Sequence, residues 1–190
     1  MSTIILESNS TAYWYKLVHE AEASCETILN EELESYLVFL LMRHIKKPQI
    51  TSNVMAVDYL ESLAANGQVQ QDKLRDVGDQ CLIFSGFFPK IAEVRMVKVS
   101  YFVAIGMSAY HALADTCKIQ LCEFYHQLAE KFVNLMDVLA VIRNMNKPAE
   151  VLSTLAAAEL WADTRSKMAL KTVQNRTDAA ICLDTSRFKH

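Results

Sequence analysis

Apolar side chains recur at steps of three and four residues through most of this 190-residue chain. The longest example covers residues 118–145. Its apolar positions are Leu121, Tyr125, Leu128, Phe132, Leu135, Leu139 and Ile142. This spacing lines up side chains along one stripe of an α-helix, whereas a strand would need alternation. Ala129 and Met136 widen the stripe, which suits a bundle helix better than a two-stranded coiled coil. The pattern therefore predicts an all-α fold.

Turn-forming residues are scarce, with four glycines and three prolines. Because an all-β chain of this length needs many turns, the scarcity favours a few long helices joined by short loops. Pro48, Pro89 and Pro148 all lie between periodic segments, where helices should stop or start. We predict a single-domain bundle of about six or seven helices over residues 1–174, with residues 175–190 as a loosely attached tail.

The predicted helices cover residues 11–30, 31–44, 70–87, 97–116, 118–145 and 149–172, together with a segment after Pro48. Thr51 or Ser52 can cap that segment, and Asn66-Gly67 is a stop signal. Its inward face is predicted to hold Val54, Val57, Leu60 and Ala64.

The segment 97–116 is predicted to be a buried central helix, since apolar side chains fill most of its circumference. Only a softer stripe interrupts them, formed by Tyr101, Ala104, Ser108, His111 and Asp115. A glycine inside a helix costs about 1 kcal/mol relative to alanine. Gly106 is therefore best explained by another helix that packs closely against it.

Charge and hydropathy exclude several classes of protein. The formal net charge is −3 and the longest basic cluster is Lys46-Lys47, so no nucleic-acid partner is expected. The most apolar run, residues 36–42, is far shorter than the roughly 20 residues that span a bilayer. The N-terminal residues lack the pattern of a signal peptide, so we expect a cytoplasmic protein without a transmembrane segment. Association with a membrane surface is a weaker alternative, because no basic amphipathic helix is evident.

Five cysteines occur, and none belongs to a CxxC motif. They could form a zinc or redox site, or they could be reduced and buried small side chains. The second interpretation is favoured because structural zinc sites bring their ligands in close pairs. No cofactor and no metal site is expected from this pattern.

Three polar groups could carry chemistry. Arg75, Asp76 and Asp79 could line a ligand pocket, or they could form a solvated face or an Arg–Asp clamp between helices. His111 precedes Asp115 by four residues, which suggests either a general base or a structural pair. Glu123-x-x-His126 resembles half of a di-iron motif, but it occurs once and on the face away from the core.

The stretch Gly78-Asp79-x-x-Leu82, then Gly86-Phe87-Phe88, Tyr101 and Gly106-x-x-Ala109-Tyr110, resembles a family of short proteobacterial all-helical proteins. A segment around Trp161 is also similar, so the resemblance covers residues 35–172. The resemblance implies a bacterial origin and draws attention to Asp79, Tyr101 and Tyr110, and the family has no known activity to transfer. An aspartate beside a glycine can accept hydrogen bonds from tyrosine or arginine where a backbone approaches closely, as in a buried polar network.

No motif specifies a reaction, and no catalytic residue is assigned. We expect a non-enzymatic helical protein that acts through protein contacts, as an adaptor, chaperone or homo-oligomeric scaffold. The alternative is a bundle that binds a small ligand or a metal between its helices, possibly as an enzyme. Its site, or a buried polar network, would be built from Arg75, Asp76, Asp79, Arg95, Tyr101, Tyr110 and His111.

Overall fold

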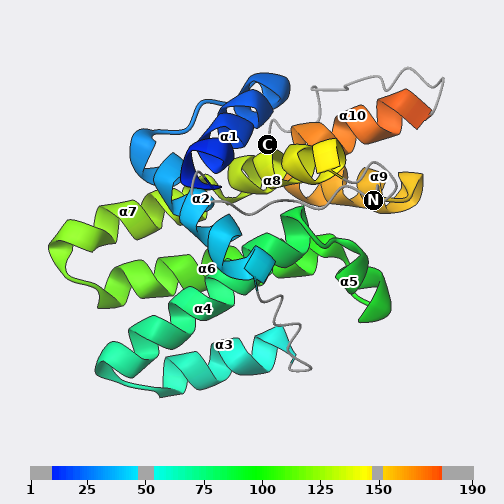
Figure 1. Ribbon diagram of the computed structural model, residues 1–190. Coiled ribbons are helices and arrows are strands. Elements are labelled where there is room, and N and C mark those ends of the chain that lie inside the picture. The colour runs from blue at the N-terminus through cyan, green and yellow to red at the C-terminus, as the bar shows by residue number, and fades with distance from the viewer. Residues whose placement is uncertain (1–9, 47–53, 147–151, 177–190) are drawn as a thin grey trace, which may run out of the picture.

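The computed structural model describes residues 10–46, 54–146 and 152–176. Within these ranges the chain forms ten α-helices and no strand, which confirms the all-α prediction there (Figure 1). The helices are α1 (Ser10–Cys25), α2 (Glu31–Lys46), α3 (Met55–Ala64), α4 (Gly67–Gly86), α5 (Lys90–Val94), α6 (Val99–Thr116), α7 (Ile119–Glu130), α8 (Phe132–Asn146), α9 (Thr154–Thr164) and α10 (Lys167–Arg176).

Helices α4 and α6 pack against each other, and α6 also contacts α3, α7, α8 and α9. Gly106 makes the close approach possible. A Cβ atom on it would lie 2.5 Å from the Phe132 ring and 2.9 Å from Cβ of Cys81. The predicted helix contact at Gly106 is therefore confirmed. Ala104 and Ser108 of the softer stripe are exposed, so α6 keeps one face in solvent and is not buried on all sides.

Three boundaries differ from the predictions. The stretch 118–145 is two helices, because the backbone at Lys131 (φ −93°, ψ 9°) leaves the helical conformation. The stretch 149–172 is divided where Arg165 takes a left-handed conformation (φ 61°) that ends α9. The short helix α5 follows Pro89 and was not predicted. The apolar stepping continues across Lys131, from Leu128 to Phe132, so periodicity alone could not reveal that division.

Helix α3 presents a different face to the core from the one predicted. Met55 and Ser62 are buried against the neighbouring helices α4 and α6, whereas Val57 and Leu60 are exposed. The prediction that Val54, Val57, Leu60 and Ala64 face inward is wrong. Its physical reason is that apolar residues fit helical spacing on two sides of this short helix, and the side with Met55 packs inward.

The remaining boundaries shift by up to five residues, the largest shift being in α1, which ends at Cys25 although the prediction extended it to residue 30. Helix α4 begins at Gly67, three residues before the predicted start, with the positive φ (60°) that glycine tolerates. The predicted caps at Thr51 and Ser52 lie outside the described residues, as do Pro48 and Pro148. Residues 175 and 176 belong to α10, although they were assigned to the tail, and residues 177–190 lie outside the description. No helix in the described ranges combines the length and the apolar character needed to cross a membrane.

Candidate functional site

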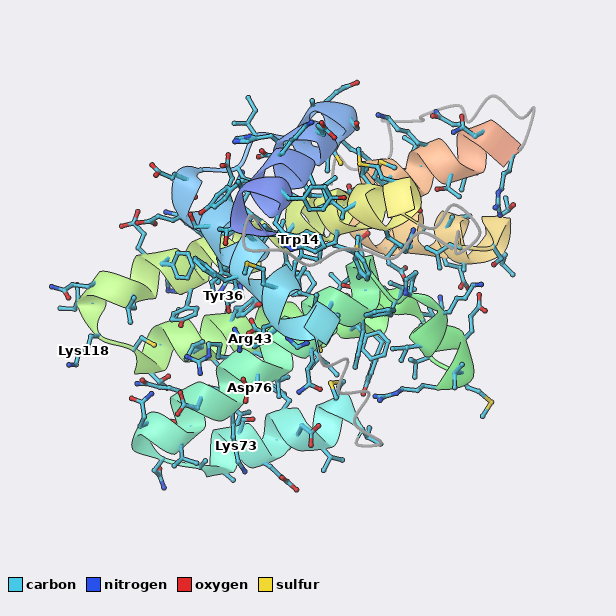
Figure 2. All side chains as sticks on the ribbon, in the orientation of Figure 1. Trp14, Tyr36, Arg43, Lys73, Asp76 and Lys118 are labelled. Carbon is cyan, nitrogen blue, oxygen red and sulfur yellow. The ribbon has the colours of Figure 1, made fainter. Side chains whose placement is uncertain are left out.

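Asp79 lies where α2, α4 and α6 meet, and its side chain is almost fully buried (1% exposed). Its Oδ1 atom accepts hydrogen bonds from the hydroxyl groups of Tyr36, at 2.5 Å, and Tyr110, at 2.8 Å. Its Oδ2 atom lies 3.2 Å from Nη2 of Arg43. We call these four residues the Asp79 network. Figure 2 shows Tyr36 and Arg43 on α2 as this helix passes α4.

Burial controls the electrostatics of the Asp79 network. Loss of water raises the pKa of the Asp79 carboxyl to about 6, although the two tyrosines and the Arg43 guanidinium act in the opposite direction. The pKa values of Tyr36 and Tyr110 rise well above their usual value, because burial and the adjacent carboxylate both disfavour a phenolate. The tyrosines therefore remain hydrogen-bond donors at any physiological pH.

Gly78 lets Tyr110 reach Asp79. A Cβ atom at this position would lie 2.4 Å from the Tyr110 ring, which is closer than any real contact. Tyr110 is itself fully buried between α4 and α8, where its ring also packs on Phe132. The Gly78-Asp79 pair therefore acts as a unit, since the glycine makes room for the ring and the aspartate accepts its hydroxyl.

The other two members of the predicted Arg–Asp group lie at the edge of this network. Arg75 donates to Asp72, three residues earlier, instead of pairing with Asp79. Asp76 is more than half exposed and lies 4.0 Å from Nη1 of Arg43 (Figure 2). It also borders a hollow of about 190 Å³ between α3 and α4. Of the predicted set, the structure joins only Asp79 and Tyr110 directly.

The structure places Arg95, Tyr101 and His111 elsewhere. The Arg95 guanidinium lies over the Phe84 ring, 5.3 Å from its centroid. The Tyr101 hydroxyl accepts a hydrogen bond from the backbone N–H of Ala56 at the start of α3. Nδ1 of His111 lies 3.4 Å from Nδ1 of His126 on α7, so the neighbour of His111 is another imidazole and the predicted Asp115 pairing is not the one observed.

Sequence reasoning missed a second polar group, which lies on α1 and α2. His19 Nδ1 lies 3.2 Å from Oε2 of Glu22, and His19 Nε2 lies 3.5 Å from Oε2 of Glu34. We call these three residues the His19 cluster. Nothing near His19 in the sequence suggested a site except the three-residue step to Glu22, which puts both side chains on one face of a helix. Glu34 arrives from the next helix, where spacing gives no signal.

The two carboxylates of the His19 cluster stand in different surroundings. Glu22 is buried, and its Oε1 atom accepts a hydrogen bond of 2.7 Å from the N–H of Leu29. Burial and the neighbouring Glu22 raise the pKa of Glu34. All three residues line an open hollow of about 530 Å³, whose other walls are Ala23, Glu26, Thr27 and Ile28.

A third buried carboxylate, Asp137 of α8, holds the corner between α9 and α10. It accepts hydrogen bonds from the Ser166 hydroxyl at 2.5 Å and from the Lys167 N–H at 2.9 Å. Ser166 in turn accepts the N–H of Ala169 in the first turn of α10. Asp137 therefore completes the capping of a helix N-terminus, which is a structural role.

Comparisons with family models, with curated proteins and with solved structures found no match to this chain.

Proposed function

We propose that this protein functions through protein–protein contacts, with the outer side of α3 as its contact surface. The observation that carries the proposal is the position of Leu60, which is 63% exposed although it belongs to an apolar helical pattern. The Asp79 network supports the proposal indirectly, because the strongest candidate for a ligand site has the features of a structural group. Its carboxylate is engaged by side chains of the protein itself, as in a structural contact between helices.

The outer side of α3 carries a broad apolar stripe, which winds around the helix because each three-residue step turns it by about 60°. Val54, Val57 and Leu60 follow one another at three-residue steps, and Leu63 extends them; all four are between 43% and 63% exposed. Single exposed apolar residues are common on protein surfaces, but a stripe in helical register resembles the buried face of a bundle helix. Burying it would remove apolar surface from water at about 25 cal/mol per Å².

A second copy of the chain is the partner that fits this stripe. Glu61 of α3 and Lys73 of α4 line the hollow between these two helices, with 4.0 Å between their charged atoms. A two-fold contact repeats every residue on both sides, so Glu61 of one copy can meet Lys73 of the other. Because α3 has ten residues and is about 15 Å long, the interface is small and its dissociation constant should be micromolar or weaker.

Sedimentation velocity over a wide concentration range tests the proposal. We expect the wild-type chain to shift from monomer to dimer, and Leu60→Lys to remain monomeric because it would bury a charge in the interface. Leu155→Lys is the matched control, since Leu155 is 72% exposed on α9, away from α3. A wild-type chain that stays monomeric at every concentration, or a Leu60→Lys variant that still dimerises, would refute the proposal.

A charge swap tests the predicted geometry. Glu61→Lys alone should weaken the dimer because it places two lysines opposite each other, and Glu61→Lys with Lys73→Glu should restore it. If the double variant is as weak as the single one, the two-fold arrangement is wrong even where dimerisation itself is observed.

A further inference from the structure

The His19 cluster brings three metal-ligating side chains together from two helices. One ligand atom from each of His19, Glu22 and Glu34 can be chosen so that all three lie within 4.8 Å of one another. His19 and Glu22 stand on one face of α1, and Glu34 stands on α2. The packing of α1 against α2 therefore creates this group, and no single segment of the sequence contains it.

The protein has already fixed one carboxylate of the cluster. Glu22 is 6% exposed, and the Leu29 N–H holds its Oε1 atom, so its Oε2 atom is directed at the imidazole. A hydrogen bond to the distal oxygen of a ligating carboxylate is the outer-shell contact that orients metal ligands in proteins. The other two side chains need no such anchor to reach the same ion.

Two carboxylates and one imidazole leave an excess of negative charge in this region. A protonated His19 can donate to both glutamates, but a neutral imidazole has only one N–H to offer. The negative charges of Glu22 and Glu34 then lie close together, and His19 neutralises them only in part. A divalent cation neutralises both carboxylates and also accepts the neutral imidazole as a ligand.

We propose that His19, Glu22 and Glu34 form a binding site for a divalent transition-metal ion, with Zn²⁺ as the ion tested. A nitrogen and two oxygens suit a borderline ion such as Zn²⁺, whereas Ca²⁺ and Mg²⁺ prefer oxygen ligands alone. This inference does not depend on the association of two copies through α3, because the cluster lies on α1 and α2.

The geometry requires a modest closure. Ligand atoms that share one tetrahedral Zn²⁺ ion at about 2.1 Å lie about 3.4 Å apart. The present contacts of 3.2 and 3.5 Å use the two different nitrogens of the His19 ring, Nδ1 toward Glu22 and Nε2 toward Glu34. With one ligand atom per residue, the three atoms lie within 4.8 Å of one another. His19 is the side chain that must turn so that a single ring nitrogen faces both carboxylates, and it is 63% exposed and therefore free to do so.

Three protein ligands leave a coordination position for water or a small ligand. Sites with four protein ligands are closed and structural, whereas sites with three keep an exchangeable position. The open hollow of about 530 Å³ is lined by the same three residues and gives solvent access to that position. The class of ion and the open position both follow from the ligand set.

The experiment uses the full-length chain without a histidine tag, dialysed against a chelator and titrated with Zn²⁺ in competition with a chromogenic chelator. Co²⁺ is added in a parallel titration, because its visible spectrum reports the ligands around the ion. We expect one ion per chain. His19→Gln and Glu34→Gln should each weaken binding by at least the roughly 10–100-fold that loss of an outer-shell partner costs. Both side chains reach solvent, so these variants should fold, which a circular-dichroism spectrum checks.

His126→Gln and Glu123→Gln are the matched controls, because they alter Glu123-x-x-His126 on α7, which has the same two residue types at the same spacing as His19-x-x-Glu22. Binding that is lost in the His19 and Glu34 variants and kept in both controls supports the site. Absence of stoichiometric Zn²⁺ binding, or binding that survives His19→Gln, would overturn it. Binding lost only in His126→Gln would overturn it too, because the His111–His126 pair would then be the ligand.

Discussion

The Asp79 network and the His19 cluster are built from similar materials and differ in closure. Each combines buried carboxylate with side chains from two or more helices. In the Asp79 network, two tyrosine hydroxyls donate to one oxygen of a single carboxylate, and a guanidinium lies 3.2 Å from the other oxygen. In the His19 cluster, one imidazole faces two carboxylates, so negative charge is in excess. The first arrangement has a counter-charge within the protein, Arg43, whereas we propose that a cation supplies it in the second.

Burial alone does not distinguish a structural group from a binding site. Asp79 and Glu22 are both buried and both accept short hydrogen bonds. What differs is the balance of charge and the access to solvent. Arg43 supplies the counter-charge for Asp79 from the protein, whereas the hollow beside Glu22 lets the counter-charge come from solution.

The largest expected effect on stability comes from replacing Asp79 with an apolar residue, compared with the same kind of replacement at His19. Asp79→Leu leaves the buried hydroxyls of Tyr36 and Tyr110 without their acceptor, and each unsatisfied group costs about 1–3 kcal/mol. We therefore expect the free energy of unfolding to fall by about 3–5 kcal/mol, measured by urea denaturation. His19→Leu should change it by less than about 1 kcal/mol, because this imidazole is largely exposed. Equal losses of unfolding free energy in Asp79→Leu and His19→Leu would contradict the distinction between the Asp79 network and the His19 cluster.

A smaller effect, of defined sign, comes from the titration of Asp79. Its pKa is raised from 3.8 to about 6 in the folded protein. Between these pH values the folded state holds a proton that the unfolded state has released, so this group makes the protein less stable as pH rises from about 4 to 6. The loss is on the order of 3 kcal/mol and is complete above pH 7.

Asp79→Asn isolates this titration. The amide oxygen still accepts both tyrosine hydroxyls and carries no charge, so the variant should lack this contribution and be at least as stable as wild type at pH 7. Stability is compared by urea denaturation at several pH values. Asp76→Asn is the control, because Asp76 is more than half exposed. A wild-type curve that runs parallel to that of Asp79→Asn would mean that Asp79 stays ionised through this range.

The sequence predicts the Asp79 network better than the His19 cluster, for a physical reason. Gly106 and Gly78 are costly inside helices, and each cost is explained by a ring that needs the space, from Phe132 and Tyr110. Local chemistry thus indicates where helices touch. It does not name the partners from distant helices: Tyr36 and Arg43 lie about forty residues before Asp79, in an apolar helix where nothing marks them.

The sequence also failed to predict where a long helical stretch is interrupted. Leu128 and Phe132 belong to the same apolar stripe, although Lys131 between them leaves the helical conformation. Neither proline nor glycine marks the division, and the stripe is buried on both sides of it. On α3, the same ambiguity in spacing led to the wrong face. Periodicity identifies helices reliably, but it cannot choose between two apolar faces of one short helix or detect a bend that keeps the stripe buried.

The smallest expected effect is also the sharpest test of the His19 cluster. The difference in stability between Glu34→Gln and wild type should change sign when Zn²⁺ is added. Without metal, Glu34→Gln removes one of two crowded carboxylates. Since burial and Glu22 already disfavour the charged form of Glu34, the variant should be slightly more stable than wild type at pH 7, by under about 1 kcal/mol. Glu123→Gln, at an exposed position on α7, should change nothing.

With Zn²⁺ at a hundred times its dissociation constant, wild type should gain about 2.7 kcal/mol that Glu34→Gln largely lacks, so the order of stability inverts. Thermal unfolding of both chains with a chelator and with Zn²⁺ measures both orders. A Glu34→Gln chain that is less stable than wild type even in chelator would show that Glu34 is a structural partner of His19. The His19 cluster would then be as self-sufficient as the Asp79 network, because the imidazole alone would supply the counter-charge that we assign to a cation.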